Sequence, residues 1–190
     1  MSTAKKNLSD YNMNDIPNAK GLRFSIIVSN WNKEITDRLL DGTIQTLINS
    51  GVESDDIFII DVPGSFELLY ASKKVMIATH DLKTATELEM VHADSIVNPN
   101  FDAIICLGSV IKGETKHFDF ICNTVTNGIK DLNLLVSPEE KTPYPPVIFG
   151  VLTDDTYEQA INRSGGKYGN KGVEAAITAI CMSKLKIRSI

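Results

Sequence analysis

Residues 107–120 read L-G-S-V-I-K-G-E-T-K-H-F-D-F, and this stretch predicts the end of a strand, a short loop and the start of a helix. The apolar run 103–107 leads into it, and the Gly-Ser pair at 108–109 is the expected corner where the strand stops. In open α/β sheets, ligands bind where strands end and helix amino-termini begin. The stretch therefore predicts an α/β fold with a ligand site between Lys112 and His117.

Two side chains in this stretch support the prediction of a site. Thr115 is a candidate N-cap of the predicted helix. In that case the backbone N–H groups from Gly113 onward are available to bind an anion. His117 falls in the first helical turn, and imidazole exchanges protons at neutral pH. The alternative interpretation is a strand-turn-helix connection with an ordinary surface histidine. These residues alone favour neither interpretation.

The stretch belongs to an alternation that runs through the chain. Four β-rich apolar runs predict strands, at residues 24–29, 57–62, 103–107 and 147–152. Amphipathic spacing and capping residues predict helices at 33–49, 66–76, 117–130 and 156–162, and a last helix that follows the Gly-rich loop 164–172 and ends near residue 186. Apolar strands alternating with helices predict a four-stranded parallel sheet covered on both faces, a single-domain three-layer αβα fold.

The length of 190 residues, 43% of them hydrophobic, suits one core-forming domain. Residues 1–20 are polar without a sustained period, so they predict an N-terminal arm and a domain over 21–190. Residues 78–100 fit no simple alternation and are expected to be a surface loop or a helical extension. Their candidate metal ligands match no spacing of a known metal site: His80, Glu87, Glu89 and His92.

Charge and composition argue against several classes of protein. The net charge is −5, from 19 basic and 24 acidic residues without a block of one sign, which disfavours binding to nucleic acid or a membrane surface. Strand-sized apolar runs and a polar amino-terminus predict a cytoplasmic protein. Three cysteines without C-x-x-C spacing predict buried free thiols. Neither G-x-G-x-x-G after the first strand nor a G-K-[ST] loop occurs, which disfavours a dinucleotide enzyme or an ATPase.

Four strand ends carry polar or aromatic residues, at 31–32, 64–67, 109–117 and 149–150. We expect these segments to converge, because parallel strands bring their carboxyl ends to one edge of a sheet. Trp31 suits stacking on a heterocyclic ring, or equally an anchor in the core or an interface. Glu67 either complements a helix dipole or recognises a hydroxyl group. For Arg163 the residues alone favour a solvated helix-end arginine, and a phosphate clamp is the alternative.

Five blocks in unbroken order resemble one family. They are S-N-W-N-K-E-I-T (29–36), D-V-P-G-S-F-E-L (61–68), the stretch 107–120, P-V-I-F-G-V-L-T (146–153) and R-S-G-G-K-Y-G-N-K-G-V-E-A-A (163–176). Together they closely resemble 6,7-dimethyl-8-ribityllumazine synthases. Each block alone is a weak signal, but five in order are specific.

The resemblance implies a doubly wound, flavodoxin-like subunit that assembles into pentamers and, in some members, into a hollow icosahedral shell. It implies condensation of 5-amino-6-(D-ribitylamino)uracil with 3,4-dihydroxy-2-butanone 4-phosphate, which releases phosphate and water in the penultimate step of riboflavin biosynthesis and uses no cofactor. The implied partners are these two small molecules, neighbouring subunits with active sites between them and, as a candidate, riboflavin synthase. Relative to compact members, residues 78–100 resemble an insertion, and the arm is a candidate added strand on a neighbouring subunit.

The resemblance also implies roles for individual residues. His117 matches the proton-transferring histidine, and Trp31 matches the aromatic residue that stacks on the uracil ring, where many members have Phe. The other matches are Ser65, Phe66 and Glu67 for the ribityl chain; Ser109, Val110 and Ile111 for backbone contacts to the pyrimidine; Glu114 and Thr115 for the phosphate-binding turn; and Phe149, Arg163 and Lys171 for the wall supplied by the neighbouring subunit, with Arg163 on phosphate.

Two alternative functions stay open on the sequence. One is a catalytically idle assembly or flavin-binding protein of the same fold. Joint retention of Trp31, Glu67, His117 and Arg163 argues against it, because an idle shell need not keep all four. The other is riboflavin synthase activity, but the matching blocks favour the condensation of an amine with a ketone.

Overall fold

Four parallel strands form the central sheet of the computed structural model, in the order β2-β1-β5-β6. The structure describes residues 7, 9–12, 15–79, 91–92, 95–96, 100–135 and 144–185. The strands of the sheet are β1 (Phe24–Ser29), β2 (Ile57–Val62), β5 (Ala103–Ile111) and β6 (Val147–Asp154).

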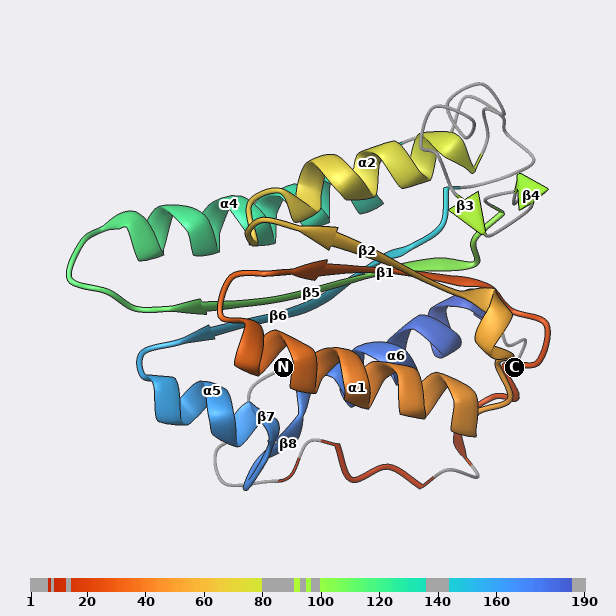
Figure 1. Cartoon of the computed structure of the whole chain (residues 1–190), viewed down its shortest axis with the longest axis horizontal. Helices are drawn as coiled ribbons and strands as arrows, with labels where there is room; N and C mark the ends of the chain where they lie inside the picture. Colours follow the sequence, from red (N-terminus) through yellow and green to blue (C-terminus); the bar gives the residue numbers. More distant parts are fainter. Residues whose placement is uncertain are drawn as a thin grey trace, which may run out of the picture.

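Helices cover both faces of this sheet (Figure 1). One face carries α1 (Lys33–Asn49), α5 (Tyr157–Arg163) and α6 (Lys171–Ser183), and the other carries α2 (Leu68–Ala78) and α4 (His117–Asn133). A 3-10 turn, η2 (Ser54–Asp56), precedes β2, and β3 (Val91–His92) pairs with β4 (Ser95–Ile96) outside the sheet. The expected three-layer αβα fold with a four-stranded parallel sheet is confirmed.

The winding of the chain reverses between β1 and β5. From β1 the chain passes through α1 to β2, and it then returns through α2 to β5 on the other side of β1. Phe24 of β1 lies opposite both Ile57 of β2 and Ala103 of β5, so the three strands start level with one another. Because a crevice forms beyond the carboxyl ends of strands where the winding reverses, β1 and β5 define the expected ligand edge.

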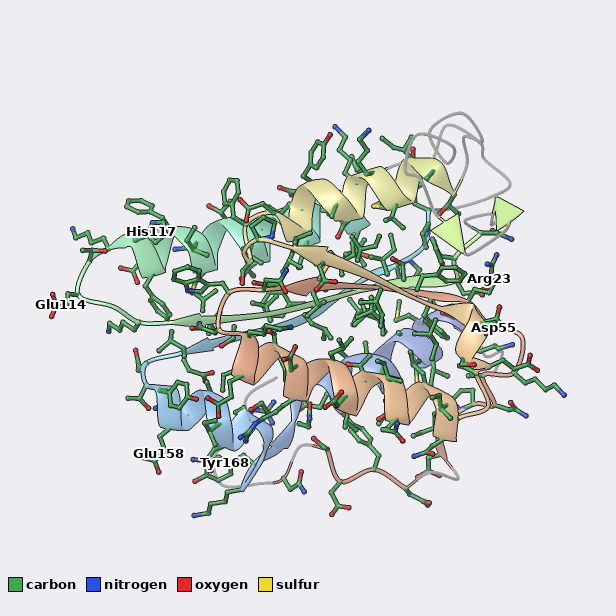
Figure 2. All side chains as sticks on the ribbon, in the orientation of Figure 1. Arg23, Asp55, Glu114, His117, Glu158 and Tyr168 are labelled. Carbon is green, nitrogen blue, oxygen red and sulfur yellow. The ribbon has the colours of Figure 1, made fainter. Side chains whose placement is uncertain are left out.

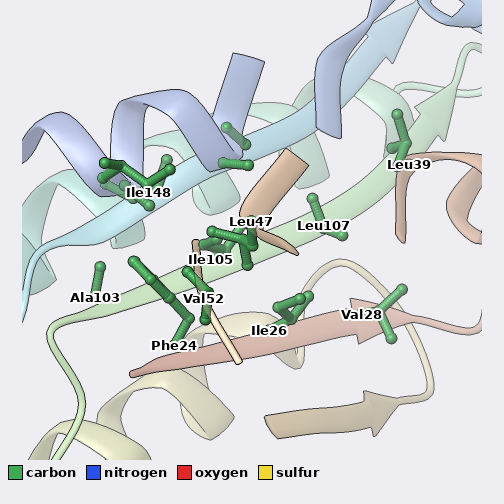
Figure 3. Packing of buried hydrophobic residues seen from close by; sticks show 14 of the residues in the cluster. Phe24, Ile26, Val28, Leu39, Leu47, Val52, Ala103, Ile105, Leu107 and Ile148 are labelled. Carbon is green, nitrogen blue, oxygen red and sulfur yellow. The ribbon is translucent and has the colours of Figure 1, made fainter. Parts of the chain in front are cut away.

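Alternate residues of β1 and β5 enter two apolar clusters, one on each face of the sheet. Phe24, Ile26 and Ile105 belong to the cluster shared with α1 and α6 (Figure 3), whereas Ile27 and Ile104 belong to the cluster shared with α2 and α4. All five side chains are fully buried. Burial of one such side chain stabilises the fold by roughly 1.5–3 kcal/mol. Burial on both faces explains why these strands are continuous apolar runs in the sequence.

Strand β5 is longer than predicted. The expected stop at the Gly-Ser pair is wrong, because β5 continues to Ile111 and pairs with β6 as far as Asp154. The β-branched Val110 and Ile111 favour this extension. Gly108 lies inside the strand, opposite Val151 of β6, and a Cβ at this position would come within 2.7 Å of Ser65 Oγ. The glycine therefore reflects close packing between β5 and the segment after β2.

The Gly-rich segment predicted as a loop is a β-hairpin. Its strands β7 (Ser164–Gly166) and β8 (Gly169–Asn170) pair antiparallel, and α6 begins directly after β8. Gly169 has a φ of +86°, a conformation that favours glycine. The hairpin therefore holds the end of α5 beside the start of α6.

Other predictions have mixed outcomes. Residues 80–90, with His80, Glu87 and Glu89, lie outside the described residues, as does the side chain of His92. The short strands β3 and β4 within segment 78–100 were not predicted, and the rest of its character stays a prediction. All three cysteines are free thiols, as predicted, but Cys122 is partly exposed and Cys181 is exposed, so the predicted burial holds for Cys106 alone. None of the described helices is long and apolar enough to cross a membrane.

Candidate functional site

A cavity of about 680 Å³, which we call the first cavity, opens at the carboxyl edge of the sheet. The segments that follow β1, β2 and β5 meet there, as the reversal of winding predicts. Its lining residues are Trp31, Gly64, Ser65, Phe66, Glu67, Ser109, Val110, Ile111, Gly113, Thr115, His117, Phe118 and Ile121. No individual role was predicted for three of these lining residues, Gly64, Phe118 and Ile121, whereas Gly113 begins the predicted anion-binding turn.

Trp31 stands at the corner after β1, and local hydrogen bonds tie this corner to β5. The Trp31 N–H donates to Ser29 Oγ at 3.2 Å, and Asn32 Nδ2 donates to the carbonyl oxygen of Ser109 at 2.9 Å. Asn32 has a φ of 56°, a left-handed conformation that asparagine tolerates. The Trp31 side chain is 70% exposed, which excludes an anchor in the core of its own subunit. Its indole is therefore available to stack on a planar ring.

The segment after β2 brings three kinds of group to the first cavity. Ser65 is buried, and its hydroxyl has no hydrogen-bond partner among the described residues. Phe66 is half-exposed, and Glu67 occupies the N-cap position of α2. A Cβ on Gly64 would lie 2.9 Å from Glu67 Oε2, so the carboxylate folds back over this turn. Ser65, Phe66 and Glu67 thus bring a hydroxyl-bearing residue, an aromatic ring and a carboxylate to the lining of one cavity.

His117 is the first residue of α4, and it lines the first cavity together with Thr115. The prediction of Thr115 as the N-cap is wrong, because Lys116 holds that position with a helical φ of −67°. Thr115 Oγ1 still accepts a long hydrogen bond, of 3.4 Å, from the His117 N–H. Glu114 does not line the first cavity and lies at the outer end of the connection from β5 to α4 (Figure 2).

Phe149 and Lys171 line a different cavity, of about 430 Å³, which we call the second cavity. Residues of β6 and α6 form much of its wall, and Tyr11 of the N-terminal arm also contributes. Phe149 is distant from the first cavity because β6 continues to Asp154, about 16 Å further along the strand. The predicted convergence of Phe149 with the other three strand ends is therefore wrong within one subunit.

Arg163 contacts α6 and does not line the first cavity. Its Nη2 donates to Glu174 Oε1 at 2.5 Å, and its Nη1 donates to the carbonyl oxygen of Tyr168 at 2.7 Å. Lys171 Nζ donates to Glu174 Oε2 at 3.3 Å. Arg163 does end α5, as predicted, but its side chain is only 18% exposed, so the favoured interpretation of a solvated arginine is wrong. One carboxylate thus holds both basic residues, Arg163 and Lys171, which we call the cation pair.

Asp154 is a half-buried acid at the carboxyl end of β6. Its Oδ2 has no hydrogen-bond partner among the described residues, and its carbonyl oxygen accepts from the Lys112 N–H at 2.9 Å. Burial raises the pKa of Asp154 to about 6; the charge of Arg163 opposes this rise, and the charge of Asp155 adds to it. No pattern in the sequence marks Asp154, because its burial arises only in the folded chain.

Glu174 is a second site residue that the sequence does not single out. Its one signal in the sequence is a spacing of three residues from Lys171, which places two opposite charges on the same side of a helix. That spacing is common on solvated helices, so it does not single out a site. The ion pair with Arg163 depends on the hairpin, which no periodicity predicted.

The groups of the first cavity suit a particular kind of ligand. Two exposed aromatic rings, a buried hydroxyl and a carboxylate favour a planar ring that carries a hydroxylated chain. An imidazole at the rim provides a group for proton transfer. In the part of the chain that the structure describes, no cluster of three or more His, Cys, Asp or Glu side chains is arranged to hold a metal ion.

Comparison with known proteins identifies the family. A family model described as 6,7-dimethyl-8-ribityllumazine synthase matches residues 21–186. The chain is 48% identical to proteins of that name from Christiangramia forsetii and Flavobacterium johnsoniae, over 98% of this chain and 95% or 84% of the relative. It is 44% identical to a protein of the same name from Porphyromonas gingivalis, over 98% of this chain and 99% of the relative. The chain therefore belongs to the 6,7-dimethyl-8-ribityllumazine synthase family, and it is an enzyme that acts on small molecules.

Proposed function

We propose that this enzyme condenses 5-amino-6-(D-ribitylamino)uracil with 3,4-dihydroxy-2-butanone 4-phosphate to form 6,7-dimethyl-8-ribityllumazine, in the penultimate step of riboflavin biosynthesis. The first cavity is the observation that carries the proposal. It gathers Trp31, Glu67 and His117 from segments that follow three different strands. Its volume of about 680 Å³ is within the usual range of small-molecule sites.

The pyrimidine substrate occupies the first cavity in this proposal. Trp31 stacks on the uracil ring, and the backbone of residues 109–111 contacts the edge of that ring. Ser65, Phe66 and Glu67 hold the ribityl chain, since a carboxylate and an unpaired buried hydroxyl both gain from bonding to hydroxyl groups. Glu114 and Thr115 belong to the turn that receives the phosphate of the second substrate.

The reaction joins an amine to a ketone. The 5-amino nitrogen attacks the ketone carbon, the adduct loses water to give an imine, phosphate leaves from the four-carbon chain, and the second nitrogen closes the new ring with loss of water. His117 gives and takes protons in these steps. Positioning contributes most of the rate, since well-oriented reactants gain roughly 7–11 kcal/mol in the best cases, against about 10²–10⁴-fold from acid-base catalysis.

Each active site is shared between two subunits in this proposal. The neighbour supplies Phe149 and the cation pair, because within one subunit these residues lie on or beside the second cavity and away from the first. The enzyme is then active as a pentamer or as a shell of pentamers, and separated subunits are inactive. Sedimentation of the active enzyme distinguishes a pentamer from a shell. Verified monomers with full activity would exclude shared sites.

The proposal extends to the organisation of the chain. Residues 1–20 are an arm, residues 21–190 are the catalytic domain, and residues 78–100 are an insertion in it. The range of the family match, residues 21–186, supports the first boundary. The enzyme acts in the cytoplasm and uses no cofactor, which cell fractionation and exhaustive dialysis before assay would check.

The experiment that tests the reaction mixes the purified protein with both substrates and follows the absorbance or fluorescence of the lumazine product. We expect product to form at a rate proportional to enzyme concentration. A protein that forms no product while a control enzyme does so under the same conditions lacks the proposed function. Conversion of added lumazine to riboflavin, without the condensation, would instead support riboflavin synthase activity.

A further inference from the structure

The two residues of the cation pair flank the hairpin β7–β8. Arg163 directly precedes β7, and Lys171 directly follows β8. Ser164 and Asn170, the residues adjoining the two cations, lie opposite each other in the hairpin. The separation of the two positive charges therefore depends on the base of this hairpin as well as on their shared partner, Glu174.

All the polar groups of Asn170 have partners. Its side-chain Oδ1 accepts from the Gly172 N–H at 2.8 Å and caps α6, while its Nδ2 donates to the carbonyl oxygen of Arg38 in α1 at 2.8 Å. Its backbone N–H donates to Ser9 Oγ at 2.5 Å, and its carbonyl oxygen accepts from the same hydroxyl at 2.9 Å. Asn170 thus joins α1, α6 and the N-terminal arm at the residue next to Lys171.

The arm fits closely over the hairpin. A Cβ on Gly169 would come within 2.2 Å of Asn7 Oδ1 and 2.4 Å of Ser9 Oγ, so a larger residue at this position would displace the arm. Asn7 Oδ1 also accepts from the Ser9 N–H at 2.9 Å, which orients Ser9 toward Asn170. Tyr11, two residues further on, lines the second cavity together with Lys171. In Figure 1 the arm passes beneath α1 and reaches the hairpin.

We propose that Ser9 and Asn170 form a latch between the arm and the hairpin, and that this latch positions the cation pair to bind the phosphate group of the butanone phosphate substrate. This inference rests on the proposed function. Two cations bind one phosphate well only when their separation and direction are held to a fraction of an ångström. Without the latch, the base of the hairpin is less constrained. The side chains of Arg163 and Lys171 then occupy a wider range of positions. Binding of the pyrimidine substrate does not depend on the latch, because the first cavity contains no residue of the hairpin or the arm.

Ser9→Ala tests the latch, since it removes one hydroxyl and leaves Asn170 in place. We expect the KM for the butanone phosphate to rise about tenfold, the effect of one or two lost hydrogen bonds, while the KM for the pyrimidine and kcat change less than about twofold. Ser9→Thr, which keeps the hydroxyl, should restore the wild-type KM. Asp10→Ala is the matched control, because Asp10 is the next residue of the arm and is exposed.

Calorimetric titration with inorganic phosphate gives a second reading that needs no turnover. We expect Ser9→Ala to weaken phosphate binding about tenfold and Asp10→Ala to leave it unchanged. Equal rises in the KM of both substrates, no change in either, or a failure of Ser9→Thr to restore the wild-type KM would overturn the latch. So would a Ser9→Ala protein that sediments differently from wild type, because the arm would then act through assembly. If the wild-type protein forms no lumazine, the proposed function is wrong, and the phosphate titration still decides whether the latch controls anion binding.

Discussion

Arg163 and Glu174 form a largely buried ion pair, with 2.5 Å between Nη2 and Oε1 and side chains only 18% and 11% exposed. A charge in this environment is costly without its partner, since solvent no longer compensates for it. Lys171 contacts the other carboxylate oxygen at 3.3 Å. Glu174 therefore holds both cations in a fixed place, on a part of the subunit that the first cavity does not include.

Glu174→Gln is expected to lower the free energy of unfolding by about 1–3 kcal/mol, because two cations lose their common charge partner while a hydrogen-bonding side chain remains. Thermal and urea unfolding of the variant measure this change. Glu158→Gln, at an exposed position of α5, is the control and should unfold like the wild type. Equal stabilities of the two variants would mean that the Arg163 pair contributes nothing measurable.

Trp31→Ala is expected to raise the KM for the pyrimidine substrate about tenfold, since stacking on an aromatic ring contributes about 1–3 kcal/mol per base. Trp31→Phe should retain most of the affinity because phenylalanine keeps a flat ring. The control is Tyr70→Ala, which removes an aromatic side chain with 68% exposure that does not line the first cavity. Steady-state kinetics with each substrate varied in turn measures the effect. A Trp31→Ala enzyme with wild-type kinetics would rule out stacking.

His117→Ala is expected to lower kcat by about 10²-fold without abolishing turnover, because acid-base catalysis is the smaller contribution and both substrates still bind. Single-turnover measurement of lumazine formation separates this effect from product release. The exposed Lys116 adjoins His117 in the chain, so Lys116→Ala controls for disturbance of the first turn of α4. Full activity of His117→Ala would remove the histidine from the mechanism.

Asp154→Asn is expected to stabilise the protein above pH 6 and to have little effect near pH 4. Burial raises the pKa of Asp154 from 3.8 to about 6, so the folded protein holds this proton more tightly than the unfolded chain does. The stability contributed by proton binding is complete below pH 4 and is lost as the pH rises through 6. Allowing for solvent screening of this half-exposed group, we expect a gain of about 1 kcal/mol at pH 7.5.

Thermal unfolding of Asp154→Asn at several pH values between 4 and 8 measures this gain. Asp41→Asn, at an exposed position of α1, is the control and should show no change with pH relative to wild type. If Asp154→Asn raised the stability equally at every pH, the gain would not arise from ionisation of Asp154.

Gly172→Ala is expected to destabilise the protein by about 3 kcal/mol or more, because a Cβ there would lie 2.0 Å from the carbonyl oxygen of Leu39 in α1. That contact is with backbone, so relief requires α1 and α6 to separate. The matched control is Gly113→Ala, since no heavy atom lies within 4 Å of a Cβ at that position. Urea unfolding of the two variants gives the comparison. A Gly172→Ala protein as stable as Gly113→Ala would mean that the two helices separate without cost.

Local pattern predicted most of the elements but not all of their ends. Helix α1 and strands β1 and β2 have the predicted bounds, because each combines a clear period with a glycine, proline or asparagine at its end. Strand β5 runs past its Gly-Ser pair because residues up to Ile111 pair with β6. A glycine can mark either a turn or a place where another segment packs closely against the backbone. At Gly108 only the position of Ser65 in the folded chain shows that the second case applies.

The sequence by itself determined the family, the three layers and the convergence of the segments after β1, β2 and β5. The family follows from the five resembling blocks in order. Periodicity and the direction of parallel strands are sufficient for the layers and the convergence, since both follow from local spacing and one rule of topology. Only the tertiary structure decided that Arg163 is buried against Glu174, that Phe149 faces a second cavity, and that Asp154 holds its proton to about pH 6. Those properties depend on desolvation and on contacts between elements, and no local pattern of residue types encodes them.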